Sequence, residues 1–196
     1  MIRPEQEQAL LQLAEASIRH GLQQGCPLKP KRDDYDPALQ EPGACFVTLK
    51  REGELRGCIG SLTAHRPLVE DVAENAYAAA FSDPRFYPLQ AGELFGLELH
   101  ISLLGEAEPM QFRSENDLLE QLRPGVDGLI LEEGFRRGTF LPSVWEQLPE
   151  PKAFLHHLKL KAGLPVNYWS ATIRISRYTT HGFGTVIGAE SRSGLN

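Results

Sequence analysis

The residues best suited to chemistry are a guanidinium and a thiol two positions apart, Arg56 and Cys58. Side chains alternate between the two faces of an extended strand, so these two are expected to point the same way. A neighbouring cation favours the thiolate, which is the nucleophilic form of cysteine. The sequence therefore predicts a reactive or ligand-contacting thiol at Cys58. A buried structural cysteine beside a surface arginine is the alternative.

Glycines lie close to this cysteine on both sides, at Gly57 and Gly60. Glycine buries no side chain and loses more backbone entropy on folding than other residues, so it weakens a strand interior. A strand with two glycines in four residues is expected to contain a bulge or a bend, or to let another group approach its backbone. Both glycines are therefore candidate substrate-binding residues.

A base for the thiol is harder to find in the sequence. His65 follows Cys58 by seven residues and could reach it only if the chain folds back. Glu98, His100 and Ser102 share one face of a predicted strand, where neighbours two apart lie roughly 6.5–7 Å apart along the axis. Because that spacing is too long for a direct proton relay, the pattern favours a solvated sheet face.

Asp83 and Arg85 directly follow a predicted helix that the Ser82-Asp83-Pro84 sequence ends. One interpretation is a loop in which Asp83 bonds to nearby backbone and Arg85 pairs with a carboxylate. In the other, Arg85 binds an anion near Cys58, and Asp83 helps to orient a polar or anionic substrate. The sequence leaves both interpretations open.

Composition bounds the class of protein. The chain has 196 residues and a formal net charge of −6, which argues against a dedicated nucleic-acid binder. No apolar run approaches the length of a membrane-spanning helix, and the N-terminus lacks the apolar region of a signal peptide. The three cysteines form no CxxC pair and no even set, so neither a zinc site nor a disulfide framework is indicated. These features predict a cytoplasmic protein without a metal, and they identify no cofactor.

Hydrophobic periodicity alternates between helical and strand patterns, and most of the strands are joined as hairpins. This order favours an α+β domain over a parallel, doubly wound sheet. Residues 26–43 form a long connection, a kind of segment that is often functional. The expected helices cover residues 4–22, 67–81 and 151–162, with a short helix from Ser114, and the expected strands cover residues 45–49, 55–62, 97–104, 128–132, 139–141 and 173–177.

The hexapeptide Leu55–Gly60 resembles the signature of the AMMECR-type domain, whose prokaryotic members are called protein A of the AmmeMemoRadiSam system. Two positions depart from the family pattern, Asp127 where many members have histidine, and Ser143. Further segments resemble the family in the same order, over roughly residues 5–180: Phe46-Val47-Thr48-Leu49, Asp83-Pro84-Arg85-Phe86, Glu93-Leu94, Ile101-Ser102-Leu103-Leu104, Gly128-Leu129, Leu141-Pro142-Ser143-Val144, Lys161-Ala162-Gly163 and Arg177-Tyr178.

This resemblance implies a barrel-like, mainly antiparallel sheet with flanking helices, in two unequal lobes with a cleft between them. It favours a single domain over residues 1–183, and it makes Ser102 a candidate substrate-binding residue. Residues 184–196 are small and polar, a composition that predicts a loose tail. The resemblance also implies a modification pathway shared with a Memo-type protein and a radical S-adenosylmethionine enzyme. No reaction follows from the resemblance itself.

Two functional hypotheses remain. In the first, the protein is an enzyme of that pathway in which Cys58 is the nucleophile or carrier, Arg56 favours its thiolate, and Arg85 with Asp83 orients the substrate. In the second, it is a non-catalytic binding or adaptor module for those partners or for a small ligand. In that case, Gly57 and Gly60 let the partner's backbone or the ligand approach the strand. The 26–43 connection would gate the binding site or dock the partner.

Overall fold

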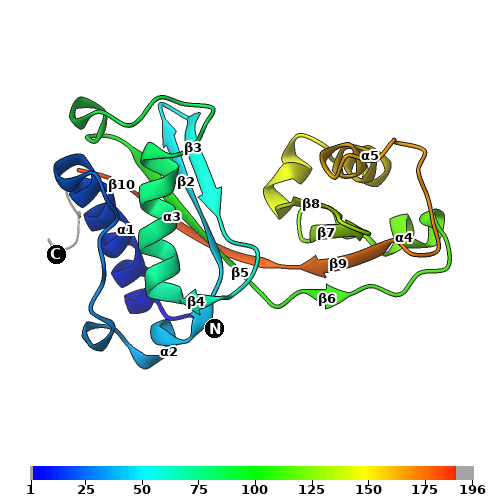
Figure 1. Cartoon of the computed structure of the whole chain (residues 1–196), viewed down its shortest axis with the longest axis horizontal. Coiled ribbons are helices and arrows are strands. Elements are labelled where there is room, and N and C mark those ends of the chain that lie inside the picture. The colour runs from blue at the N-terminus through cyan, green and yellow to red at the C-terminus, as the bar shows by residue number, and fades with distance from the viewer. Residues whose placement is uncertain (1, 189–196) are drawn as a thin grey trace, which may run out of the picture. The chain divides into compact units, whose positions relative to one another are not determined.

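The computed structural model describes residues 2–188 and shows an α+β protein with antiparallel strand pairs, as the sequence predicts (Figure 1). The chain divides into two compact units. Unit 1 is built from the chain up to Leu104 and again from Gly182, and unit 2 from Gly105–His181. The described residues contain no helix that is long and apolar enough to cross a membrane.

Unit 1 is a four-stranded sheet covered on one face by two helices (Figure 1). The strand order is β10-β5-β2-β3, and the two helices are α1 (Pro4–Gln24) and α3 (Leu68–Phe81). The strands are β2 (Cys45–Arg51), β3 (Glu54–Gly60), β5 (Glu98–Leu104) and β10 (Thr180–Val186). Short elements complete the unit: 3-10 turns at Arg32–Asp34 and Ala91–Glu93, helix α2 (Pro37–Gln40), and the strand pair β1 (Pro42–Gly43) with β4 (Arg66–Pro67).

The sequence explains why these helices pack closely. Pro4 occupies the first turn of α1, and the left-handed Gly25 ends the helix by donating its N–H to Gly21 O. Gly21 leaves room for the rings of Tyr77 and Phe81 from α3, because an added Cβ would lie 2.4 Å from the Phe81 ring. The core between helices and sheet consists of apolar side chains such as Leu10, Ile18, Val47, Leu49, Val72, Ala76, Leu99 and Ile101.

Unit 2 has its own four-stranded sheet, in the order β6-β9-β7-β8, and its own core. Its strands are β6 (Glu108–Pro109), β7 (Gly128–Glu133), β8 (Arg136–Phe140) and β9 (Arg174–Tyr178). Its helices are α4 (Glu115–Gln121), α5 (Pro151–Lys161) and a 3-10 helix at Pro142–Glu146. At the centre of this core, the Trp145 and Phe154 rings stack 3.8 Å apart.

Two expectations about architecture need correction. The barrel-like closure is not confirmed, because both four-stranded sheets are open in the described part of the chain: β10 and β3 are the edges of one, and β6 and β8 of the other. The loose tail does not begin at residue 184, since β10 continues to Val186 and Ile187 is buried in the unit 1 core. The rest of the expected tail, residues 189–196, lies outside the described residues.

Candidate functional site

Cys58 lies on β3, the edge strand of the unit 1 sheet, on the face opposite the helices. Its neighbour Gly57 points to the helix side, and the alternation of the strand turns Cys58 to the other face. On that face, Cys58 lies opposite Thr48 of β2, and Thr48 lies opposite His100 of β5. The Cys58 Sγ and Thr48 Oγ1 atoms are 3.3 Å apart and form a hydrogen bond.

Arg56 has no paired residue on β2, because β3 contains a bulge. Leu49 pairs with Gly57 and Lys50 with Leu55, so Arg56 is the extra residue. Its guanidinium donates from Nε and Nη2 to Glu93, at 2.8 and 3.0 Å, and from Nη2 to Tyr87 O. These bonds raise the pKa of Arg56 and lower the pKa of Glu93. The bulge is among the expected outcomes, but the charge of Arg56 is compensated by Glu93 rather than directed at the thiol.

Asp83 and Arg85 do reach Cys58, through its backbone. The Cys58 N–H donates to the Asp83 carboxylate at 2.9 Å, and Arg85 Nη2 donates to Cys58 O at 3.4 Å. Asp83 is buried and also accepts from Arg85 Nε and Nη2, and these bonds, followed by the one from Cys58, hold its pKa well below the ordinary value. The pair therefore satisfies both outward backbone groups of an edge strand at the cysteine itself.

The contacts of this pair match the loop interpretation, and they also place Arg85 beside Cys58. Arg85 pairs with a carboxylate directly after a helix, as the loop interpretation expects, and that pairing raises its pKa. It also places a positive charge beside Cys58, with 55% of its side chain exposed. In the described part of the chain, Arg85 Nη1 has no hydrogen-bond partner, so one edge of the guanidinium remains open to an anion.

The two glycines are approached closely by the chain's own atoms. A Cβ on Gly57 would lie 2.0 Å from the carbonyl oxygen of Ala79 on α3, and a Cβ on Gly60 would lie 2.3 Å from the Phe46 ring. Close approach of another group was one of the expected reasons for glycine here. The groups that approach are internal, so the contacts explain both glycines without a ligand.

Ser102 lies on the same sheet face as Cys58, one row further along. It pairs with Phe46, which pairs with Gly60. His100 occupies the row between Ser102 and Glu98, but its ring lies against Gly182 and Gly184 of β10, on the side away from Thr48. Partial desolvation, followed by the charge of Lys50, lowers the pKa of His100, so it is neutral at pH 7.

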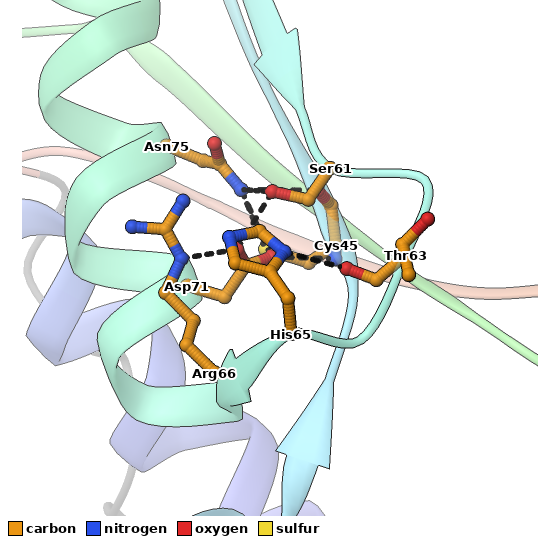
Figure 2. A network of polar contacts seen from close by, with 7 residues as sticks. All are labelled: Cys45, Ser61, Thr63, His65, Arg66, Asp71 and Asn75. Carbon is orange, nitrogen blue, oxygen red and sulfur yellow. Dashed lines mark hydrogen bonds and ion pairs between the residues drawn. The ribbon is translucent and has the colours of Figure 1, made fainter.

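A second polar network holds the chain where it leaves β3 (Figure 2). The fully buried Asp71 of α3 accepts from Cys45 N at 3.0 Å, Ser61 Oγ at 2.7 Å and Asn75 Nδ2 at 3.0 Å, and Arg66 Nε lies 3.0 Å from it. Burial, followed by the Asp71 charge, raises the pKa of Cys45 well above its ordinary value. Cys45 is therefore a structural thiol.

His65 belongs to the loop beside this network, and its ring nitrogen pairs with that loop rather than acting as a base for Cys58. Its Nδ1 is 2.8 Å from Thr63 O, within the same loop (Figure 2). Asp127, where the family pattern often has histidine, is fully buried and binds Arg123 through Nε and Nη2. Both residues therefore have local structural contacts. Within residues 2–188, no group of three or more histidine, cysteine or acidic side chains is placed to hold a metal ion.

Sequence reasoning did not single out Thr48 or Glu93, although both are central to the observed contacts. Thr48 was detectable in principle, because strand alternation places it on the polar face of residues 45–49. Its pairing with Cys58 depends on the hairpin register, which the bulge shifts by one residue. Glu93 lies 37 residues from Arg56, and no local pattern connects the two.

Comparison with known proteins gives consistent matches. A model of the AMMECR1 family matches residues 11–183. A protein of Methanothermobacter thermautotrophicus is 37% identical over 148 residues, which cover 74% of this chain and 77% of that protein. Protein MJ0810 of Methanocaldococcus jannaschii is 37% identical over 158 residues, 79% of each chain. The crystal structure of uncharacterized protein PH0010 from Pyrococcus horikoshii matches with a TM-score of 0.86 and 33% identity, covering 93% of each chain. None of these names states an activity.

Proposed function

The chain belongs to the AMMECR1 family, and we propose that it is a cytoplasmic enzyme of a modification pathway in which Cys58 is the nucleophile or carrier. The observation that supports this role best is the Cys58–Thr48 pair on the helix-free face of the unit 1 sheet. The thiol is half-buried there, while its backbone is held from the strand edge by Asp83 and Arg85. A fixed backbone beneath a partly accessible side chain suits a reactive group.

The other two cysteines are poorer candidates for the same role. Cys45 is fully buried within the Asp71 network. Cys26 is exposed just beyond the end of α1, and its Sγ lies 3.6 Å from His20 Nε2. Cys58 alone combines partial exposure with a hydroxyl partner and a neighbouring guanidinium.

The surroundings of Cys58 favour a polar or anionic substrate. The open edge of Arg85 can bind a carboxylate or phosphate group, and the hydroxyl of Ser102 lies on the same sheet face as the thiol. Attack requires loss of the thiol proton, and Thr48 Oγ1 is the hydrogen-bonding group at the sulfur. His100 is the neutral imidazole of the next strand, and its ring would have to turn from β10 towards Thr48 to accept that proton.

The proposal is tested by thiol alkylation in the Cys26→Ser background, which removes the exposed competing thiol. Iodoacetamide is added to the folded protein at a series of pH values, and mass spectrometry follows the two remaining cysteines. We expect Cys58 to react in the native state and Cys45 only after denaturation. Thr48→Val should change the rate at which iodoacetamide alkylates Cys58. Thr63→Val, in an exposed loop, should leave that rate unchanged. If Cys58 is alkylated only in denaturant, it cannot be the nucleophile of the folded protein.

A binding or adaptor module is the second candidate, and one observation favours it. Tyr87 and Phe95 flank the segment that holds Arg56, and they are 91% and 79% exposed. Large exposed aromatic side chains are typical of protein-binding surfaces. A Memo-type protein and a radical S-adenosylmethionine enzyme are the partners proposed from the family resemblance.

Co-elution with each purified partner separates the two candidates. An adaptor should lose partner binding in a Tyr87→Ala, Phe95→Ala double variant and keep it in Cys58→Ser. If the protein is instead an enzyme that uses Cys58, Cys58→Ser should abolish product formation, and the Tyr87→Ala, Phe95→Ala double variant should retain it.

A further inference from the structure

A groove of about 450 Å³ in unit 1 is independent of the Cys58 site. It lies between the first turns of α1 and the connection that follows that helix, and none of its lining residues belongs to β3. Its volume is within the range of small-molecule sites. The lining residues are Arg3, Glu5, Gln6, Ala9, Gln12, Leu13, Ala16, Asp34, Tyr35, Asp36 and Leu39.

The part of the lining contributed by the body of α1 is mostly apolar, with Gln12 as its polar member. Ala9, Leu13 and Ala16 follow one another along one face of the helix, at spacings of four and three residues. Leu13 and Leu39 are almost fully buried, and Tyr35 is half-buried and packs against the same core. A ligand with an aromatic or aliphatic body could therefore remove apolar surface from water here.

The polar part of the lining carries excess negative charge. Arg3 is committed to Asp36, with its Nη2 2.5 Å from the carboxylate, and the Arg3 N–H donates to Gln6 Oε1. Within residues 2–188, Glu5 and Asp34 form no ion pair. The groove thus joins an apolar floor to two carboxylates that lack a cation.

We propose that this groove binds a small organic cation, an ammonium group carried on an aromatic or aliphatic body. The cation would lie near Glu5 and Asp34, and the body would lie over Ala9, Leu13 and Leu39. The Tyr35 ring adds a π face, which attracts cations and not anions. This assignment gives a role to part of the long 26–43 connection, which the Cys58 site does not use.

The test uses three probes of similar size that differ in charge: 2-phenylethylammonium, 2-phenylethanol and 3-phenylpropionate. Binding to the full chain is followed by NMR chemical-shift titration at low ionic strength. We expect saturable binding of the ammonium probe with a Kd in about the millimolar range, weaker binding of the alcohol, and none of the carboxylate. Raising the salt concentration should weaken the ammonium binding.

Variants locate the site. Glu5→Gln and Asp34→Asn should each weaken ammonium binding about five-fold, the effect of losing one partly solvated charge contact. Asp33→Asn is the matched control, because Asp33 is exposed on the same turn but does not line the groove. Ala9→Phe should fill the groove and abolish binding while the far-UV circular dichroism stays unchanged.

Three outcomes would overturn the assignment. The first is no saturable binding of the ammonium probe, and the second is equal affinity for the alcohol. The third is an affinity that Glu5→Gln, Asp34→Asn and a folded Ala9→Phe variant all leave unchanged. Each measurement is independent of Cys58, so a negative result in the alkylation experiment would not affect this one.

Discussion

At the scale of single residues, Asp83 connects most of the contacts around Cys58. An edge strand presents unpaired N–H and C=O groups that can recruit another chain. Asp83 accepts the Cys58 N–H from that edge, and it also orients Arg85, which donates to Cys58 O. One buried carboxylate therefore binds the strand edge, orients the Arg85 guanidinium and accepts the Arg85 N–H in the segment after α3.

Replacing Asp83 with Asn should lower the free energy of unfolding by about 2 kcal/mol at pH 7, because charge-assisted hydrogen bonds are lost at a buried site. The measurement is urea denaturation of wild type and variant between pH 7 and pH 2. The pKa of Asp83 is lower in the folded than in the unfolded protein, so its stabilisation is present above the unfolded pKa of about 4 and is lost as pH falls towards the folded pKa.

The difference in free energy of unfolding between wild type and Asp83→Asn should therefore be largest near neutral pH, and it should decrease below about pH 4. Asp33→Asn is the control, since the Asp33 side chain is exposed and forms no hydrogen bond or ion pair within residues 2–188. A difference in free energy of unfolding that stays constant from pH 7 to pH 2 would show that the charge of Asp83 does not contribute to stability.

At the scale of secondary-structure elements, the approach of β3 to α3 depends on a missing side chain. The Gly57 backbone lies against the Ala79 carbonyl, and a Cβ there would be 2.0 Å from the oxygen. Gly57→Ala should therefore force the strand and helix apart and cost about 3 kcal/mol of stability, at the upper end for overpacking. Thermal and urea unfolding measure it. Gly92→Ala is the matched control, because an added Cβ there has no atom within 4 Å; equal effects of the two would contradict this account.

The Asp71 network ties α3 to the segment that follows β3 (Figure 2). Asp71→Ala would leave the Cys45 N–H and the Ser61 hydroxyl without this acceptor, and it would remove the partner of Arg66. We expect a loss of about 3 kcal/mol, the usual result of breaking a buried charged network from one side. Hydrogen exchange at the Cys45 amide should also become faster. Glu74→Ala, on the same helix, should change neither quantity.

Features that depend on local interactions could be predicted from the sequence, and features that depend on non-local interactions could not. Strand and helix patterns depend on neighbours within one element, and so the α+β class, α1 and α3 could be predicted. The alternation that puts Cys58 and Ser102 on polar faces could be predicted for the same reason. The bulge at Arg56 could be suspected from Gly57, but its partner Glu93 could not, because that contact needs the tertiary fold. The attachment of Asp83 to the Cys58 backbone has the same non-local origin.

At the scale of the whole molecule, each compact unit has its own apolar core. The chain leaves unit 1 after Leu104, whose N–H donates to Ala44 O, and unit 2 begins at Gly105, whose N–H donates to Thr179 O. The first residue of unit 2 is thus hydrogen-bonded close to its last. A segment with adjacent ends and its own core has the properties of an insertion that folds as a unit. The AMMECR1 match over residues 11–183 includes residues of both units.

We therefore expect the isolated fragment 105–181 to fold. Its core contains the stacked Trp145 and Phe154 rings together with Leu118 and Leu129, all nearly or fully buried. Domains of this size can fold alone, although with a small margin of stability. Far-UV circular dichroism should show helix and strand, and urea unfolding should be cooperative. Leu129→Ala should remove about 3 kcal/mol and unfold the fragment, because its margin is small. A wild-type fragment with a random-coil spectrum would show instead that unit 2 needs the remainder of the chain to fold.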